Sequence, residues 1–225
     1  MKTIIANWKM NKTTKEAKEF FASLNLDKAE GVRVVVCLPF TALGSVRGVC
    51  LGAQNIHHEA GGAFTGEISG AMLRDAGVEY VLVGHSERRT YNNETDELVA
   101  KKIKAALESG IVPVLCIGES LTERESGKTN DVLARQLGSI PSEGEIIVAY
   151  EPVWAIGTGL VASTQQIRDT HAFIRSVVDF PILYGGSANE KNASEILAIE
   201  NVDGLLVGGA SLCPEKFKLI TTLVE

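Results

Sequence analysis

The segment 149–159 combines a carboxylate with a loop that could close over a substrate. Glu151 directly follows an apolar run, residues 146–150, and precedes a loop that begins with Pro152 and ends with Gly159. In a parallel α/β barrel, reactive groups lie at the carboxyl ends of the strands, and a loop after a strand can close and exclude water. We therefore predict a catalytic base at Glu151. An isolated Glu-Pro pair more often only ends a strand, so this prediction depends on other residues at the same rim.

Two further strand ends carry cationic or titratable groups. Lys9 and Asn7 follow an apolar run, where an ammonium group is costly unless it meets an anion or extends to solvent. His85 precedes Ser86 and Glu87 at a strand-to-helix turn, where the positive end of the helix disfavours the imidazolium. We expect Lys9 to face an anion. We expect His85 to be neutral and to donate a hydrogen bond.

Glycine pairs follow the last two apolar runs, in residues 185–187, which end with Ser187, and in residues 208–209. Glycines let backbone N–H groups approach a ligand closely, and short helices after these strands can direct their N-termini at a phosphate group. Together with the lysine, the pairs favour a dianionic phosphoester as the ligand. Glycine pairs alone are common in loops for steric reasons, so this interpretation also depends on convergence at one rim.

Eight short apolar runs have the pattern of buried strands. Because the runs are continuous rather than alternating, they are typical of parallel strands that are buried on both faces. They span residues 3–6, 32–37, 49–53, 80–83, 112–116, 146–150, 181–184 and 204–207. Eight alternating β and α units in 225 residues predict an α/β fold, a single-domain (β/α)8 TIM barrel over residues 1–225 with eight parallel strands.

The segments between the runs predict helices of unequal length. Residues 95–109 have an apolar face and acids in the first turn, and another helix opens with Ser163 and Gln166 at capping-box spacing. Only residues 38–48 separate the second and third strands, and the link after the fifth strand has room for little beyond a short helix near residues 131–137. We therefore expect some shortened outer helices.

Composition excludes several classes of protein. A content of 45% hydrophobic and 22% charged residues is ordinary for a globular protein. A net charge of -6 argues against a general nucleic-acid surface, so an anionic ligand needs a local positive site. The apolar runs are far shorter than the roughly 20 residues that span a bilayer, and the amino terminus lacks a signal-peptide pattern. We expect a cytoplasmic protein with no membrane partner.

The cysteines and three of the histidines are expected to be structural. The four cysteines form no C-x-x-C pair and mostly lie within or beside apolar runs, which is typical of reduced thiols. His57 and His58 lack a third ligand at a spacing that would complete a metal site. His171 lies on the apolar stripe of its helix, so we expect it to be packed and hydrogen-bonded. We predict no metal site.

These stretches closely resemble the signatures of the triosephosphate isomerase family. The resemblance runs from the first strand to the last helix and includes residues 7–11, 63–67, 84–89, 149–159, 184–187 and 206–211. It implies an aldose-ketose isomerase that interconverts dihydroxyacetone phosphate and D-glyceraldehyde 3-phosphate through an enediolate, in glycolysis and gluconeogenesis, with no cofactor. The family is itself a standard example of a base, a neutral histidine and loop closure, so those roles are carried over from it.

The resemblance assigns the chemical steps to five residues. Glu151 would move the proton between C1 and C2. His85 would polarise the carbonyl group and shuttle protons between the two oxygens of the enediolate. Lys9 and Asn7 would stabilise the developing negative charge. Glu87 would support proton transfer or position Lys9.

The resemblance also assigns the phosphate site and the lid. The backbone N–H groups of four residues would hold the phosphate, namely Gly157, Ser187, Gly208 and Gly209. The Ser187 hydroxyl would assist them. The lid would close over the substrate, with Ile156 shielding the base from water, because an exposed enediolate could eliminate its phosphate. The lid residues are Pro152, Val153, Trp154, Ala155, Ile156, Gly157, Thr158 and Gly159.

A homodimer is implied as well, because Thr65 resembles the family's dimer contact, which inserts into the partner subunit near its active site.

The chain also departs from familiar members of the family. The segments after the second, fifth and sixth strands are shorter, Leu38 stands where a proline is common, and Leu160 replaces a lysine often found beyond the lid. We expect the shortening to alter stability or subunit packing more than turnover.

Two alternatives remain open. Another phosphate-binding barrel isomerase, acting on a larger sugar or indole phosphate, could share the glycine pairs but would need a roomier pocket. A noncatalytic phosphate-binding barrel would keep Ser187 and the glycines while dispensing with Glu151 or His85.

Overall fold

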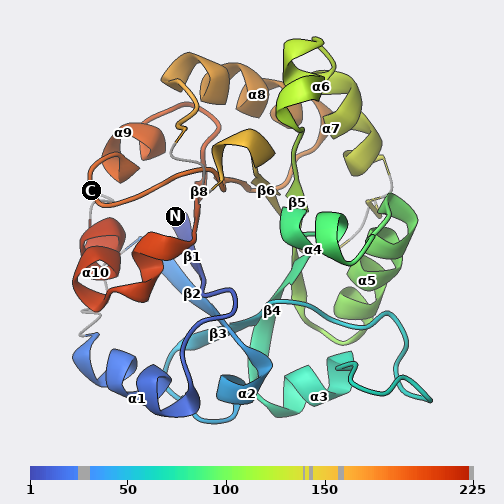
Figure 1. The fold of residues 1–225 in the computed structure, drawn as a ribbon, viewed down its shortest axis with the longest axis vertical. Helices are drawn as coiled ribbons and strands as arrows, with labels where there is room; N and C mark the ends of the chain where they lie inside the picture. Colours follow the sequence, from blue (N-terminus) through green and yellow to red (C-terminus); the bar gives the residue numbers. More distant parts are fainter. Residues whose placement is uncertain (25–30, 139, 142–143, 157–159, 223–225) are drawn as a thin grey trace.

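Eight parallel strands form a closed barrel in the computed structural model, which describes residues 1–24, 31–138, 140–141, 144–156 and 160–222. Strands that are neighbours in the chain are neighbours in the barrel, and β8 pairs with β1 to close it (Figure 1). The strands are β1 Lys2–Asn7, β2 Val32–Leu38, β3 Cys50–Ala53, β4 Val78–Val83, β5 Val112–Ile117, β6 Ile147–Tyr150, β7 Ile182–Tyr184 and β8 Gly204–Val207. All eight predicted strands are confirmed.

Helices surround the barrel (Figure 1). They are α1 Thr14–Ser23, α2 Phe40–Leu43, α3 Gly70–Asp75, α4 Ser86–Tyr91, α5 Asp96–Glu108, α6 Leu121–Glu125, α7 Thr129–Leu137, α8 Thr164–Val177, α9 Ala193–Leu197 and α10 Pro214–Thr222. The short 3-10 helices are η1 Val153–Ala155 and η2 Gly209–Leu212. The four-residue α2 is the shortened helix that the sequence predicts between the second and third strands.

The helix ends follow from local hydrogen bonds. Ser163 and Gln166 form the predicted capping box of α8, and the Thr95 side chain accepts a hydrogen bond from Leu98 at the start of α5. Helix α6 was not predicted, although Ser120 and Glu123 form a capping box there too. Such boxes satisfy backbone N–H groups that have no partner inside the helix.

The hydrophobic residues divide into a cluster inside the barrel and a cluster between the strands and the helices. Successive side chains of a strand point to opposite faces, so Ile5 lies in the inner cluster and Ile4 in the outer one. Cys37 and Cys116 belong to the inner cluster, and all four cysteines are free thiols. Within the described ranges, the helices are too short or too polar to cross a membrane.

Candidate active site

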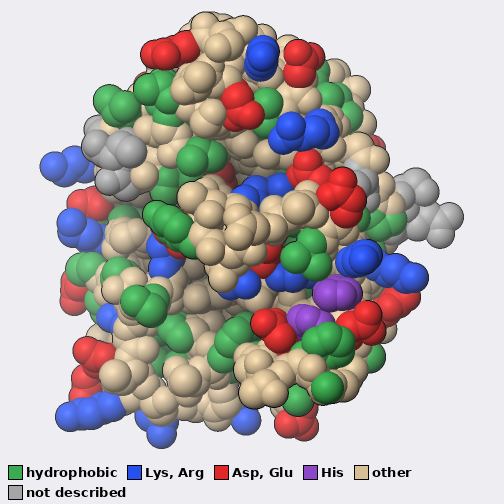
Figure 2. All heavy atoms as spheres, turned by 45° about the vertical axis from the view of Figure 1, so that its right-hand side comes forward, with side chains coloured by type: hydrophobic (Ala, Val, Ile, Leu, Met, Phe, Trp, Pro, Cys, Tyr) green, Lys and Arg blue, Asp and Glu red, His purple; other side chains and the backbone are tan. Residues whose placement is uncertain are grey.

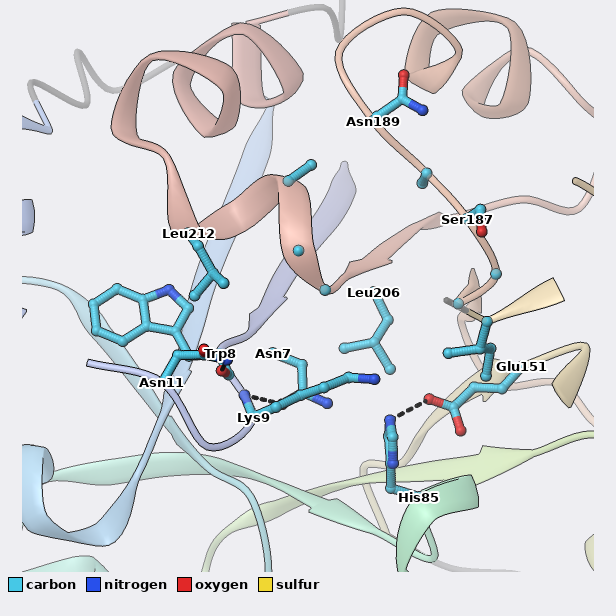
Figure 3. Close-up of a pocket in the computed structure, with 17 residues that line it drawn as sticks. Asn7, Trp8, Lys9, Asn11, His85, Glu151, Ser187, Asn189, Leu206 and Leu212 are labelled. Carbon is cyan, nitrogen blue, oxygen red and sulfur yellow. Dashed lines mark hydrogen bonds and ion pairs between the residues drawn. The ribbon is translucent and has the colours of Figure 1, made fainter. Parts of the chain in front are cut away.

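A cavity of about 290 Å³ lies at the carboxyl ends of the strands (Figure 3). It brings together most of the predicted site residues, namely Asn7, Lys9, His85, Glu151, Ile156, Ser187, Gly208 and Gly209. Side chains from β1, the β4–α4 turn and the end of β6 therefore face the same space as the glycine pairs that follow β7 and β8. Its size is at the lower end of the range for small-molecule sites, which is about 300–1,000 Å³.

Glu151 lies at the end of β6 with its side chain almost fully buried, only 3% exposed. One carboxylate oxygen lies 3.1 Å from Nε2 of His85, and the other accepts a hydrogen bond of 3.1 Å from the backbone N–H of Ser86. Burial tends to raise the pKa of Glu151, but the His85 ring and the Ser86 N–H outweigh burial and lower the pKa below its ordinary value. The group is therefore a carboxylate near neutral pH, as a base requires.

His85 is the N-cap residue of α4. Its Nδ1 accepts a hydrogen bond of 3.2 Å from the backbone N–H of Glu87, so in a neutral ring the proton lies on Nε2, which faces Glu151. Burial alone lowers the pKa of His85. The nearby Glu151 carboxylate makes the main contribution that raises this pKa, and the net shift is upward. Movement of the carboxylate away from the ring would remove the main upward contribution and favour the neutral form. The neutral histidine stays a prediction.

Lys9 follows β1 in a left-handed conformation, with a φ of +51°. Two side chains hold its backbone there: Asn7 accepts a bond of 3.0 Å from the Lys9 N–H, and Gln54 donates a bond of 2.9 Å to the Lys9 carbonyl oxygen. A non-glycine residue in this region is uncommon and is often found at functional sites. Its ammonium group lies 2.5 Å from Glu87, and Figure 3 shows the side chain extending toward His85 and Glu151.

The glycine pairs form the opposite wall of the cavity. A Cβ carbon on Gly186 would lie 2.2 Å from the Tyr184 hydroxyl, so only glycine fits there. Gly208 precedes η2, whose first residue is Gly209, and the Ser211 hydroxyl donates to the Gly208 carbonyl oxygen at 2.6 Å. Backbone N–H groups at the start of such a turn of helix are suited to bind an anion.

The described part of the predicted lid, residues 152–156, contains η1 and is hydrogen-bonded to two polar side chains outside it. The Trp154 indole N–H donates to the carboxylate of the fully buried Glu119 at 3.0 Å. The Ser187 hydroxyl donates to the Ala155 carbonyl oxygen at 2.6 Å. The predicted lid is therefore bonded to Ser187, in the wall of the cavity that the glycine pairs form. The predicted lid residues Gly157, Thr158 and Gly159 lie outside the described residues, and with Gly157 so does one predicted phosphate ligand.

Comparison with known proteins shows the family. The sequence profile of the family described as Triosephosphate isomerase matches residues 2–224. The chain is 49% identical to the triosephosphate isomerase of Alkaliphilus metalliredigens, over 96% of this chain and 97% of the relative. It is 48% identical to the triosephosphate isomerase of Aquifex aeolicus, with the same shares of both chains covered. The chain belongs to the triosephosphate isomerase family.

The structural comparison gives the same family. The crystal structure of triosephosphate isomerase from Bartonella henselae has a TM-score of 0.87 and 38% identity, and the match covers 99% of this chain and 98% of that chain. The alignment with the triosephosphate isomerase of Alkaliphilus metalliredigens extends over 241 positions, whereas this chain has 225 residues. This chain therefore lacks residues that the relative has, whereas the location of the shortening in particular outer segments stays a prediction.

The sequence did not predict Gln54 or several residues that line the cavity. Gln54 follows β3 and bonds to the carbonyl oxygens of Lys9 and Cys37, so it joins two strand ends. Its place at a strand end was the signal that could have found it. The residues that line the cavity and were given no role from the sequence are Trp8, Asn11, Ala188, Asn189, Leu206, Ala210 and Leu212.

Two groups of residues lie away from the cavity. The His57 and His58 rings pack together with their centroids 4.5 Å apart, in the segment between β3 and α3. His171 is fully buried in α8, and its Nδ1 lies 3.0 Å from the Asn201 carbonyl oxygen, which confirms the prediction of a packed, hydrogen-bonded histidine.

Proposed function

We propose that Glu151 and His85 carry out the reaction of a triosephosphate isomerase, the interconversion of dihydroxyacetone phosphate and D-glyceraldehyde 3-phosphate. The family and the isomerase activity follow from the comparisons. The observation that carries the assignment of residues is the 3.1 Å approach of Glu151 to the His85 ring inside a cavity whose other wall is made of glycine pairs. The comparisons do not support the two alternative barrel functions.

The proton transfer needs a carboxylate on one side of the substrate carbon and a donor at its oxygen. A substrate that enters between Glu151 and His85 replaces their mutual contact. The carboxylate then faces C1 or C2, and the Nε2–H group of His85 donates to the carbonyl oxygen. Once the His85 contact is replaced, the Ser86 N–H and the Lys9 ammonium group still favour the carboxylate form of Glu151. The substrate carbon then loses its proton to a carboxylate that is already desolvated.

The negative charge that develops on the substrate oxygens meets Lys9 and Asn7. Lys9 is held by Glu87 through its ammonium group and by Asn7 through its backbone. We assign Glu87 the role of positioning Lys9. A preoriented cation stabilises an enediolate without the cost of reorganisation during the reaction.

The phosphate group is assigned to the wall formed by Ser187, Gly208 and Gly209, with Gly157 as the contribution of the lid. The Ser187 hydroxyl is bonded to Ala155, so a phosphate that accepts from this hydroxyl would exchange that bond. Occupation of the phosphate site is thereby coupled to the position of the lid. Ile156, which lines the cavity, would exclude water from Glu151 in the closed arrangement.

A homodimer through the loop of residues 54–69 is part of the proposal, as are one barrel domain over residues 1–225 and a location in the cytoplasm. Thr65 is exposed, and large exposed hydrophobic side chains include Phe64 at 42% and Met10 at 97%. Figure 2 shows hydrophobic side chains beside two adjacent histidines on one face of the molecule. An exposed apolar side chain beside Thr65, such as Phe64, is suited to contact a second copy.

A coupled assay tests the proposed function. The purified chain is given D-glyceraldehyde 3-phosphate, and the dihydroxyacetone phosphate that forms is reduced by a coupling dehydrogenase with consumption of NADH. We expect turnover that is unchanged after treatment with a chelator, because the proposed chemistry uses no metal. Lack of turnover in both directions would refute the proposal.

A further inference from the structure

The ends of β4 and β5 are connected by a side chain. In the register of these two described strands, the last paired residues are Val83 and Leu115. The next residues in the two strands are Gly84 and Cys116. The guanidinium group of Arg89 donates to both of their carbonyl oxygens, from Nε to Gly84 at 2.8 Å and from Nη2 to Cys116 at 3.4 Å. The guanidinium group therefore links the two strands just beyond the last pair of residues in their register.

Both bonded residues adjoin the proposed catalytic pair. Gly84 directly precedes His85. Cys116 directly precedes Ile117, whose carbonyl oxygen accepts the backbone N–H of Glu151 at 2.7 Å. The guanidinium thus joins the backbone that carries His85 to the backbone that supports Glu151. A change in the separation of these two strand ends would change the distance between the base and the histidine.

The guanidinium is itself held in a fixed orientation. Its Nη1 lies 2.5 Å from Asp96, and the Arg89 side chain is only 17% exposed. Gly84 has a φ of +69°, and a Cβ carbon there would lie 3.0 Å from Nη2 of Arg89 and 2.9 Å from a methyl group of Val99. The planar group therefore packs directly on the Gly84 backbone. A lysine ends in a single nitrogen, so it cannot reproduce the two separate donor positions that Nε and Nη2 of the planar guanidinium occupy.

We propose that Arg89 is a positioning residue for the isomerisation, which sets the separation of His85 and Glu151 by bridging the ends of β4 and β5. The inference rests on the proposed function of that pair. Among the described residues, Arg89 lies outside the lining of the cavity, so it acts through the two strand ends and not on the substrate.

Three variants separate positioning from general structural support. R89K and R89A remove the bridge, and R135Q is the matched control. Arg135 also bonds to Asp96, at 3.0 Å, but its side chain is 63% exposed and it belongs to α7. We expect kcat to fall about 10-fold in R89K and about 100-fold in R89A, the size of effect that a misplacement of about 1 Å produces. R135Q should retain the kcat of the unmodified chain.

Inhibition by inorganic phosphate distinguishes the two walls of the cavity. The phosphate wall follows β7 and β8 and is not bonded through Arg89 in the described contacts. The inhibition constant and KM should therefore stay close to their original values in R89K while kcat falls.

Chemical rescue gives an independent measurement. Arg89 lines a solvent-open pocket of about 460 Å³, through which a small cation can reach the strand ends. Guanidinium chloride at low millimolar concentration should raise the kcat of R89A, whereas sodium chloride at equal ionic strength should not.

Each result bears on the inference. An unchanged kcat in R89K, an equal loss in R135Q, or a rise in KM alone would overturn it. Unfolding of both Arg89 variants, measured by circular dichroism, would also overturn it, because Arg89 would then support the fold as a whole. An inactive unmodified chain would refute the proposed function instead.

Discussion

A Cβ carbon on residue 118 would lie 1.7 Å from the carbonyl oxygen of Glu151. Gly118 directly follows β5, and the N–H of Glu151 donates to the carbonyl oxygen of the preceding residue, Ile117, at 2.7 Å. The backbone of the proposed base thus packs against the end of β5 at a position where only a hydrogen atom fits. The location of the carboxylate depends on this contact.

Replacement of that hydrogen should displace the base. We expect Gly118→Ala to reduce kcat by at least about 10-fold, because displacements of about 1 Å can cost about 100-fold. The crowding should also lower the free energy of unfolding by about 1–3 kcal/mol. Gly44→Ala is the matched control, since its Cβ carbon would meet nothing within 4 Å and its φ is -71°. Steady-state kinetics and urea denaturation of both variants check the prediction, and equal behaviour of the two would contradict it.

A second prediction concerns the buried cation of α5. Lys102 bonds to Glu94 and, at 2.7 Å, to Asn55, and its side chain is 5% exposed. Lys102→Met should lower the free energy of unfolding by at least about 2 kcal/mol, toward the roughly 3–5 kcal/mol typical of a broken buried pair. Arg88 still pairs with Glu94 at 2.5 Å, which limits the loss.

Lys104→Met on the same helix is the control for Lys102→Met. Lys104 forms an exposed pair with Glu108 at 3.6 Å, with 74% of its side chain exposed. Such pairs contribute about 0.5 kcal/mol or less. A loss of equal size in the two variants, measured by urea denaturation, would show that burial of Lys102 is not what stabilises this region.

The strand positions could be predicted from the sequence because a parallel barrel needs continuous apolar runs. Residues 80–83 were recognised in this way, whereas β4 begins earlier, at the buried Val78, which pairs with Leu51. The exposed Glu79 interrupts the apolar run between them. Lys102 could not have been predicted as buried, because its partners Glu94 and Asn55 come from other segments. Helix α6, with five residues and none buried, has too little apolar periodicity to be found that way.

The site was predictable to the extent that its residues follow strand ends. Glu151, His85 and Lys9 each follow a strand end. Their side chains are an acid, a titratable imidazole and a cation, so the sequence indicates their chemistry as well. The roles of Gly118 and Arg89 depend on contacts between neighbouring strands, which the sequence alone does not contain. The bond from Ser187 to Ala155 is a further case, because it joins segments 32 residues apart.

A third prediction concerns the dependence of stability on pH. Burial lowers the pKa of His171 to about 4 in the folded chain, whereas an unfolded histidine has a pKa of about 6.5. The unfolded chain therefore binds an additional proton between these pH values. The stabilisation is complete above about pH 6.5 and is lost as the pH falls toward 4, by about 3 kcal/mol at most. We expect the free energy of unfolding of His171→Asn, measured by urea denaturation at several pH values between about 4 and 6.5, to change less with pH than that of the unmodified chain. An equal change with pH in both would show that His171 is not the source of the effect.

A fourth prediction tests the proposed subunit contact. Thr65→Arg places a charged group on the exposed tip of the loop of residues 54–69, and burial of an unpaired charge in an interface is costly. We expect sedimentation velocity at micromolar concentration to shift from dimer to monomer. Ser126→Arg, on the exposed turn after α6, should leave the dimer intact. A dimer that persists in Thr65→Arg would place the contact elsewhere.

The most direct measurement is the turnover of Glu151→Gln, because this change removes the base and keeps the shape of its side chain. We predict that kcat falls by at least about 1,000-fold, while inhibition by inorganic phosphate is nearly unchanged because the phosphate wall is intact. A variant that keeps near-normal kcat would contradict the assignment of Glu151 as the base.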